Sequence, residues 1–121
     1  MRQEGCPVEC SVSALWTRYL QFLNRQTAWE AAHLFSEDAC LDDAAARSLG
    51  GCSGRCCGRA EITAFFSAFF AAHRVSATGI VHFGGGQFYD VCLDGAILLR
   101  CAGWISARGD KIGRLEIGLR L

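Results

Sequence analysis

The chain has 121 residues, of which 51% are hydrophobic and 20% are charged. This length fits one domain with one apolar core, and the composition argues against a disordered chain. Twelve basic residues balance twelve acidic ones, which argues against nucleic-acid binding, because counterion release requires a basic surface. No segment approaches the roughly 20 apolar residues of a membrane-spanning helix. The N-terminus lacks the apolar stretch of a signal peptide, so we expect a cytoplasmic protein without a membrane partner.

Helical periodicity predicts three helices before the first long strand. The first covers about residues 13–24, after a lead-in over residues 1–10, and gathers its apolar side chains on one side. The second begins at Thr27, because Thr27 and Glu30 have the spacing of a capping box. The third covers about residues 60–73, where apolar side chains recur at i, i+3, i+4, i+7 and i+8.

The remaining segments are predicted to be strands and turns. A short extended segment at residues 37–43 and a glycine-rich loop at residues 44–58 separate the last two helices. Four strands then form an antiparallel meander, covering residues 75–83, 87–93, 96–105 and 111–121. We therefore expect an α+β domain, a cone in which the three helices pack on the concave face of a strongly curved, mainly antiparallel sheet. Such a cone encloses a pocket.

The eight cysteines raise the question of redox and metal chemistry. In small exported proteins such a content indicates a disulfide framework, whereas a reducing compartment keeps thiols free. The spacings Cys6-x-x-x-Cys10 and Cys52-x-x-x-Cys56-Cys57 lack the two-residue gap of a zinc knuckle, and the histidines lie far away. We therefore predict no metal, no cofactor and no obligatory disulfide, with the vicinal pair Cys56-Cys57 as a candidate site of oxidation.

Four strings carry a resemblance to a known family: RYLQFLN at residues 18–24, LFSEDA at 34–39, GRAEITAFF at 58–66 and GDKI at 109–112. In this order and spacing they resemble the nuclear transport factor 2-like superfamily, which includes SnoaL-like polyketide cyclases and ketosteroid isomerases. The resemblance covers about residues 11–121. It implies a cystatin-like cone and, as in many relatives, a homodimer through the sheet. It implies the activity less firmly, because one fold hosts unrelated functions.

The ketosteroid isomerase pattern implies two site residues. In that family a tyrosine on the first helix donates to the developing oxyanion, and an aspartate after the second helix is the general base. Tyr19 and Asp43 stand at the matching positions. The family also has a protonated aspartic acid on a later strand, two positions before an aromatic residue, whereas here Ala102 precedes Trp104. The missing acid argues against steroid isomerisation and leaves a reduced proton-transfer site.

A second subgroup of the superfamily resembles limonene epoxide hydrolase and uses an Arg-x-Asp pair together with a carboxylate on the last strand. Arg100 is present, Ala102 again replaces the aspartate, and Glu116 could supply the second carboxylate. Strand alternation predicts that Arg100, Ala102 and Trp104 share the face toward the helices. An Arg100 close to Asp43 would lower the pKa of that carboxyl, whereas an isolated Asp43 would have a raised pKa.

Three functions remain open. As a binding domain, favoured by the missing acid, the protein would hold a small hydrophobic ligand in an aromatic cavity. As an enzyme, it would use Asp43 as base, Tyr19 as oxyanion donor and Arg100 as anchor for a small hydrophobic carbonyl substrate. Each candidate also has a structural interpretation: a solvated loop start for Asp43 and a core side chain for Tyr19. The cavity residues that we expect are Trp16, Trp29, Phe66, Phe70, His82 and Trp104.

The third function is an interaction surface, which is compatible with ligand binding. Apolar residues on the outer face of a bent sheet require a cover, and a two-fold interface between copies would provide one. The residues that we expect there are Phe88, Cys92, Leu115, Ile117 and Leu119.

Overall fold

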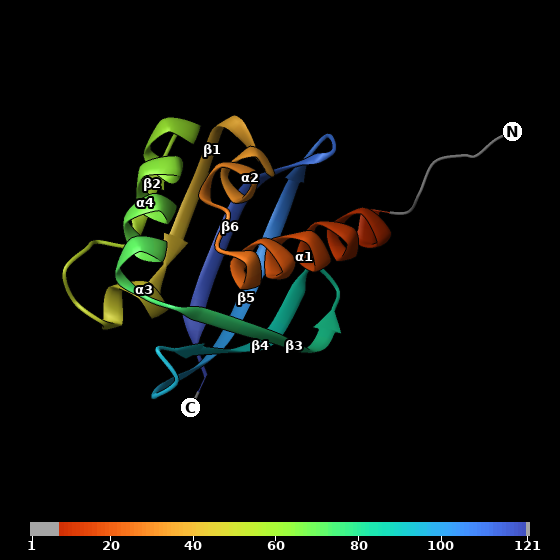
Figure 1. The fold of residues 1–121 in the computed structure, drawn as a ribbon. Helices are drawn as coiled ribbons and strands as arrows, with labels where there is room; N and C mark the ends of the chain where they lie inside the picture. The colour runs from red at the N-terminus through yellow and green to blue at the C-terminus, as the bar shows by residue number, and fades with distance from the viewer. Residues whose placement is uncertain (1–7, 121) are drawn as a thin grey trace, which may run out of the picture.

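A curved six-stranded sheet with helices packed on one face forms the molecule, and the structure, a computed structural model, describes residues 8–120 (Figure 1). We call the sheet face toward the helices the inner face and the opposite one the outer face. In chain order the elements are α1 (Val8–Arg25), α2 (Ala28–His33), β1 (Phe35–Asp43), α3 (Ala44–Ser48), β2 (Arg55–Cys57), α4 (Arg59–Ala72), β3 (Val75–Phe83), β4 (Gly86–Leu93), β5 (Ile97–Arg108) and β6 (Lys111–Leu119). The predicted α+β cone is confirmed.

The strand order is β2-β1-β6-β5-β4-β3, and β1 with β6 is the parallel pair. The predicted meander forms β3 to β6, and the short extended segment becomes β1, which pairs with β6. The register shifts between Gly79 and Val81 and again between Ser106 and Ala107. Because such bulges bend a strand and increase its twist, they help the sheet to curve around α1.

The core lies between α1 and the inner face of the sheet. The buried stripe of α1 consists of Val12, Leu15, Trp16, Tyr19 and Leu23. Trp16 reaches β5 at Gly103, where a Cβ atom would collide with its ring. Glycine at this position therefore lets the helix pack directly on the strand.

Residues 44–58 differ from the predicted loop, because they contain the short elements α3 and β2. The Asp43 carboxylate accepts a hydrogen bond of 3.0 Å from the Ala46 amide and so caps α3. Residues 55–57 pair with β1 and extend the sheet at its edge. Elements of five and three residues are too short for sequence periodicity to indicate them. The structure thus has four helices in residues 8–120, where three were predicted.

The predicted capping box at the start of α2 is wrong. Thr27 precedes the helix in an extended conformation, but its side chain makes no capping hydrogen bond. Its buried hydroxyl oxygen has no hydrogen-bond partner among the described residues. Glu30 is exposed, in the first turn of the helix.

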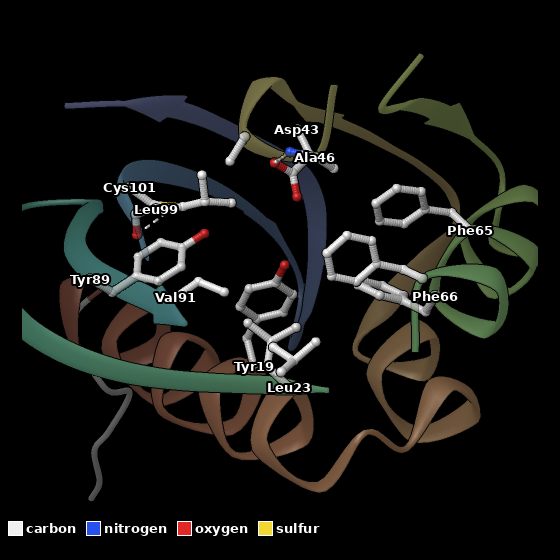
Figure 2. A pocket seen from close by; sticks show the side chains of 13 residues that line it. Tyr19, Leu23, Asp43, Ala46, Phe65, Phe66, Tyr89, Val91, Leu99 and Cys101 are labelled. Atoms are coloured by element: carbon white, nitrogen blue, oxygen red, sulfur yellow. Dashed lines mark hydrogen bonds between the residues drawn. The ribbon is translucent and has the colours of Figure 1, made fainter. Parts of the chain in front are cut away.

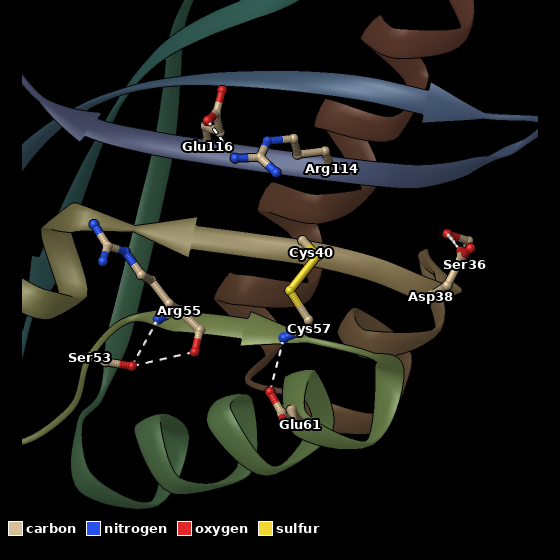
Figure 3. Close-up of a disulfide and its surroundings, with 9 residues drawn as sticks. All are labelled: Ser36, Asp38, Cys40, Ser53, Arg55, Cys57, Glu61, Arg114 and Glu116. Carbon is tan, nitrogen blue, oxygen red and sulfur yellow. Dashed lines mark hydrogen bonds and ion pairs between the residues drawn. A yellow bond between two sulfur atoms is a disulfide. The ribbon is translucent and has the colours of Figure 1, made fainter.

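The prediction of free thiols is wrong for one pair, since Cys40 of β1 and Cys57 of β2 form a disulfide (Figure 3). These residues face each other in the register of the two strands, so strand pairing brings them together. The Cys57 amide also donates to the Glu61 carboxylate of α4 at 2.9 Å. The predictions for the side chains of Cys6 and Cys10 lie outside the described part of the chain.

The described residues contain neither a cluster of metal ligands nor a helix that could span a membrane. Within residues 8–120, no three histidine, cysteine or acidic side chains gather as metal ligands. None of the helices described there is long and apolar enough to cross a membrane.

Candidate functional site

A small cavity lies between α1, α3, α4 and the inner face of the sheet (Figure 2). The volume of the cavity is about 30 Å³. A single water needs roughly 10–15 Å³ of such a cavity, whereas ligand pockets have volumes of about 300–1,000 Å³. Most of its wall is apolar, formed by Leu23, Phe65, Phe66, Phe69, Val91 and Leu99 among others. Its polar groups come from Asp43, Tyr19, Tyr89 and Cys101.

Asp43 places its carboxylate in this cavity from the end of β1 (Figure 2). One carboxylate oxygen caps α3, and the Asp43 amide donates to the Gly54 carbonyl at 2.7 Å. Burial raises the pKa of the carboxyl from 3.8 to about 6. Hydrogen bonds from the Ala46 and Ala45 amides and the charge of Arg47 oppose that rise. A carboxylate with this pKa is ionised at neutral pH and has the proton affinity of a general base.

Two tyrosines point their hydroxyls into the same cavity, Tyr19 from α1 and Tyr89 from β4 (Figure 2). Both are almost fully buried, and the Trp16 ring packs against them, with centroids 5.8 and 5.5 Å away. Burial raises the pKa of both hydroxyls well above 10, and the Asp43 charge adds to the effect. Both tyrosines therefore keep their protons and can donate hydrogen bonds.

Cys101 contributes the fourth polar group, from β5. Its thiol donates to the Leu99 carbonyl at 3.8 Å. Burial, reinforced by the charge of Asp43, raises the pKa of this thiol to about 12. It stays protonated at neutral pH, so it is a poor nucleophile.

The structure brings together three of the predicted site residues: Asp43, Tyr19 and Phe66 all line the cavity. Trp16 is buried and packs behind the two tyrosines, and its indole N–H donates to the Gly85 carbonyl at 3.3 Å. Trp16 therefore supports the cavity wall from behind.

Arg100 and Trp104 lie on the outer face of the sheet, so their predicted inward orientation is wrong. Arg100 is exposed and Trp104 is 49% exposed, whereas Cys101 and Ile105 point inward and are buried. Ala102 is buried, although strand alternation places it on the outer face together with Arg100 and Trp104. The described structure has no Asp43–Arg100 ion pair, and Asp43 is isolated from this arginine.

Three other predicted cavity residues lie elsewhere. Trp29 is 65% exposed and stacks on His33, with ring centroids 3.8 Å apart. Phe70 is half-buried and stacks on Phe66 at 5.6 Å, outside the cavity lining. His82 is exposed and lines a separate groove between α1 and β3. Glu116 is exposed too and pairs with Arg114 at 3.0 Å, so an epoxide hydrolase-like carboxylate pair does not form.

Two residues that were predicted for the dimer surface do not lie on the outer face. Leu115 and Ile117 are buried in the core, while Leu119 is 46% exposed. The outer face instead carries an aromatic cluster of Phe83, Phe88 and Trp104, whose ring centroids lie 4.6 Å (Phe83–Phe88) and 6.2 Å (Phe83–Trp104) apart.

Four further residues line the cavity without having been predicted from the sequence: Tyr89, Cys101, Phe65 and Phe69. Alternation along β4 could have found Tyr89, because Tyr89, Val91 and Leu93 are its buried set. Phe65 and Phe69 belong to the apolar stripe that the sequence predicted for α4. That stripe also includes residues that do not face the cavity, so the stripe alone does not indicate which side chains line it.

Comparisons with known proteins identify the fold. No family model and no curated protein matches this chain. A solved Mycobacterium tuberculosis protein matches with a TM-score of 0.77 and 12% identity, over 96% of both chains. A nuclear transport factor 2-like protein of unknown function from Mesorhizobium loti matches with a TM-score of 0.74 and 10% identity over the whole of both chains.

A third solved structure carries a ligand. It is a Catenulispora acidiphila protein with a ketosteroid isomerase-like fold, in complex with trimethylamine. It matches with a TM-score of 0.68 and 18% identity, over 88% of this chain and 85% of that one. Identities this low show the shared fold and leave the activity open. The chain therefore has the nuclear transport factor 2-like fold of ketosteroid isomerase-like proteins, as its sequence strings indicated.

Proposed function

We propose that the protein is an acid–base enzyme that transfers a proton on a small hydrophobic carbonyl compound, with Asp43 as general base. One observation carries the proposal: a buried carboxylate with a pKa of about 6 faces two protonated tyrosine hydroxyls in an apolar cavity. Arg100 lies exposed on the outer face of the sheet, so it does not pair with Asp43 and does not lower the pKa of that carboxyl. A base whose pKa stays raised favours proton abstraction over the anchoring of an anion.

The reaction follows from the arrangement of these groups. The carbonyl oxygen of the substrate accepts a hydrogen bond from the Tyr19 hydroxyl, and a C–H bond next to the carbonyl faces Asp43. Asp43 takes that proton, and the electron pair of the C–H bond forms an enolate whose oxygen is stabilised by Tyr19. Tyr89 supplies a second neutral donor. Return of the proton from Asp43 to the same carbon is an exchange. In a substrate with a C=C bond next to that carbon, the intermediate is a dienolate, and return of the proton to its far carbon shifts the double bond and completes an isomerisation.

Exchange of substrate protons with solvent tests this proposal without knowledge of the natural substrate. We choose 2-tetralone, a small ketone with acidic C–H bonds, and follow its deuterium uptake from D₂O by NMR. The wild-type protein should accelerate the uptake, and Asp43→Asn should lower the rate by about a hundredfold or more. Asparagine keeps the shape and the capping ability of the side chain, so α3 stays intact.

The neighbouring carboxylate provides a matched control. Asp42 pairs with Arg47 at 2.9 Å and does not line the cavity, so Asp42→Asn should exchange 2-tetralone at the wild-type rate. Tyr19→Phe, which removes the oxyanion donor, should lower the rate about a hundredfold. Equal exchange by wild type and Asp43→Asn would show that the proposal is wrong.

A second candidate function is binding of a small organic cation. An ionised carboxylate surrounded by Tyr19, Phe65 and Phe66 suits an alkylammonium ion, which aromatic faces and negative charge both attract. The trimethylamine in the structure of similar fold supports this alternative. Titration with trimethylammonium chloride separates the two: a cation that occupies the cavity should lower the pKa of Asp43 and inhibit exchange of 2-tetralone.

A further inference from the structure

A groove on the surface adjoins the cavity along α4. Its walls are one face of α4, formed by Phe65, Ala68, Phe69 and Ala72, and the loop residues Gly50, Gly51 and Cys52. A water-sized sphere can reach about 300 Å³ of it. This is the lower end of the range of about 300–1,000 Å³ that is usual for ligand pockets.

Two side chains line both spaces. Phe65 and Phe69 belong to the wall of the cavity and to the wall of the groove. Their rings stack on each other with centroids 5.8 Å apart, and both residues are half-buried. They therefore stand between the carboxylate of Asp43 and the groove.

The cavity and the groove differ about tenfold in volume. The cavity, with about 30 Å³, is too small for a carbonyl compound of several carbons. A rotation of Phe65 and Phe69 about their side-chain bonds would open the cavity toward the larger space. The groove offers room for such a rotation, because its volume of about 300 Å³ borders both rings.

The lining also indicates what the groove would hold. Alanine and phenylalanine side chains of α4 form one wall, and His73 is the one basic residue among the lining residues. The Nδ1 atom of His73 contacts the Asp94 carboxylate at 2.8 Å. No aspartate, glutamate, lysine or arginine is among the described residues that line the groove, so an uncharged apolar group fits it better than an anion or a cation.

From these observations, and on the basis of the proposed function, we propose that the groove is a second subsite of the acid–base site. The ligand is an elongated apolar ketone whose carbonyl end reaches Asp43 and Tyr19 once Phe65 and Phe69 have moved aside. Its apolar end lies in the groove along Ala68 and Ala72, beside the Cys52 thiol. The groove thereby selects the length of the substrate.

Cys52 allows occupancy of the groove to be measured directly. Among the free cysteines Cys52, Cys56, Cys92 and Cys101, Cys52 is exposed, Cys92 is half-buried and the other two are buried. In a background with Cys6, Cys10 and Cys92 changed to serine, alkylation of Cys52 by N-ethylmaleimide is followed by mass spectrometry. We expect 6-phenyl-2-tetralone to slow this alkylation at least fivefold, and 2-tetralone, which is too short to reach Cys52, to leave it within twofold.

Two variants of α4 distinguish an effect of filling the groove from a general effect of adding a ring to the helix. Ala68→Phe fills the groove, and Ala64→Phe adds the same ring at an exposed position outside it. Ala68→Phe should abolish the protection of Cys52 and raise the KM for exchange of 6-phenyl-2-tetralone at least tenfold. Ala64→Phe should leave both within twofold of the wild type.

The outcomes distinguish the two proposals. If Asp43 exchanges both ketones while Cys52 stays unprotected and Ala68→Phe changes nothing, the groove subsite is refuted and the proposed function stands. If neither ketone is exchanged and neither protects Cys52, both proposals fail. Protection by the long ketone that Asp43→Asn leaves intact, with exchange lost, supports both.

Discussion

Replacing Asp43 with asparagine should stabilise the folded protein at neutral pH, although it removes the proposed base. Burial raises the pKa of Asp43 from 3.8 to about 6. Between these two pH values the folded protein binds more protons than the unfolded chain, so the free energy of unfolding falls as the pH rises. Above pH 6 the full cost of keeping the buried carboxylate ionised applies. With about 1.36 kcal/mol for each pKa unit, that cost is about 3 kcal/mol.

Urea unfolding of the wild type and of Asp43→Asn, at a series of pH values, measures this difference. The variant should be more stable by up to about 3 kcal/mol at pH 7.5, and the difference should vanish as the pH falls below about 4. The comparison isolates Asp43, because the other titrating groups are common to both proteins. A difference that does not depend on pH, or a variant less stable than the wild type at pH 7.5, would refute the reasoning.

Asp42 gives a control of opposite sign. Its hydrogen bond with Arg47 holds the pKa of its carboxyl below 3.8. A lowered pKa contributes stability above the unfolded value, and that contribution is lost as the pH falls through the folded value. Asp42→Asn should therefore destabilise the protein at pH 7.5, by a modest amount because the pair is partly exposed.

Three other predictions follow from the geometry. Cys40→Ser, which opens the disulfide across a sequence separation of 17 residues, should lower the free energy of unfolding by about 3 kcal/mol, and reduction of the wild type should have the same effect in urea unfolding. Arg100→Ala should leave exchange of 2-tetralone within twofold, since Arg100 is exposed on the outer face; a tenfold loss would argue for a role in the site. We also expect a homodimer through the outer face, so light scattering should give about twice 13.1 kDa, and Trp104→Asp should give the monomer mass; a monomeric wild type would exclude a stable dimer.

Patterns within a single element predicted much of the fold. The stripe of α1 and the alternation in the later strands are each local, and they place Tyr19 on the buried side of its helix. The position of Asp43 followed from the resemblance to ketosteroid isomerases. The cavity then forms where these elements converge.

The failures come from positions where local patterns are ambiguous or absent. Along β5 both parities carry apolar residues, so alternation could not tell whether Arg100 or Cys101 faces inward. The choice is made by packing, because Trp16 requires a glycine on the inner face, and Gly103 shares the parity of Cys101.

The disulfide shows the second kind of failure. Cys40 and Cys57 meet because β2 pairs with β1. A three-residue strand within a glycine-rich segment has no periodicity that would predict such a pairing.

The pH dependence of deuterium uptake by 2-tetralone, measured on the wild-type protein between pH 4 and pH 8, tests the central claim most directly. If ionised Asp43 is the base, kcat/KM should rise with pH, with an apparent pKa of about 6, and level off above it. A profile that is flat over this range, or one that inflects near pH 4 as for an exposed carboxylate, would contradict the account.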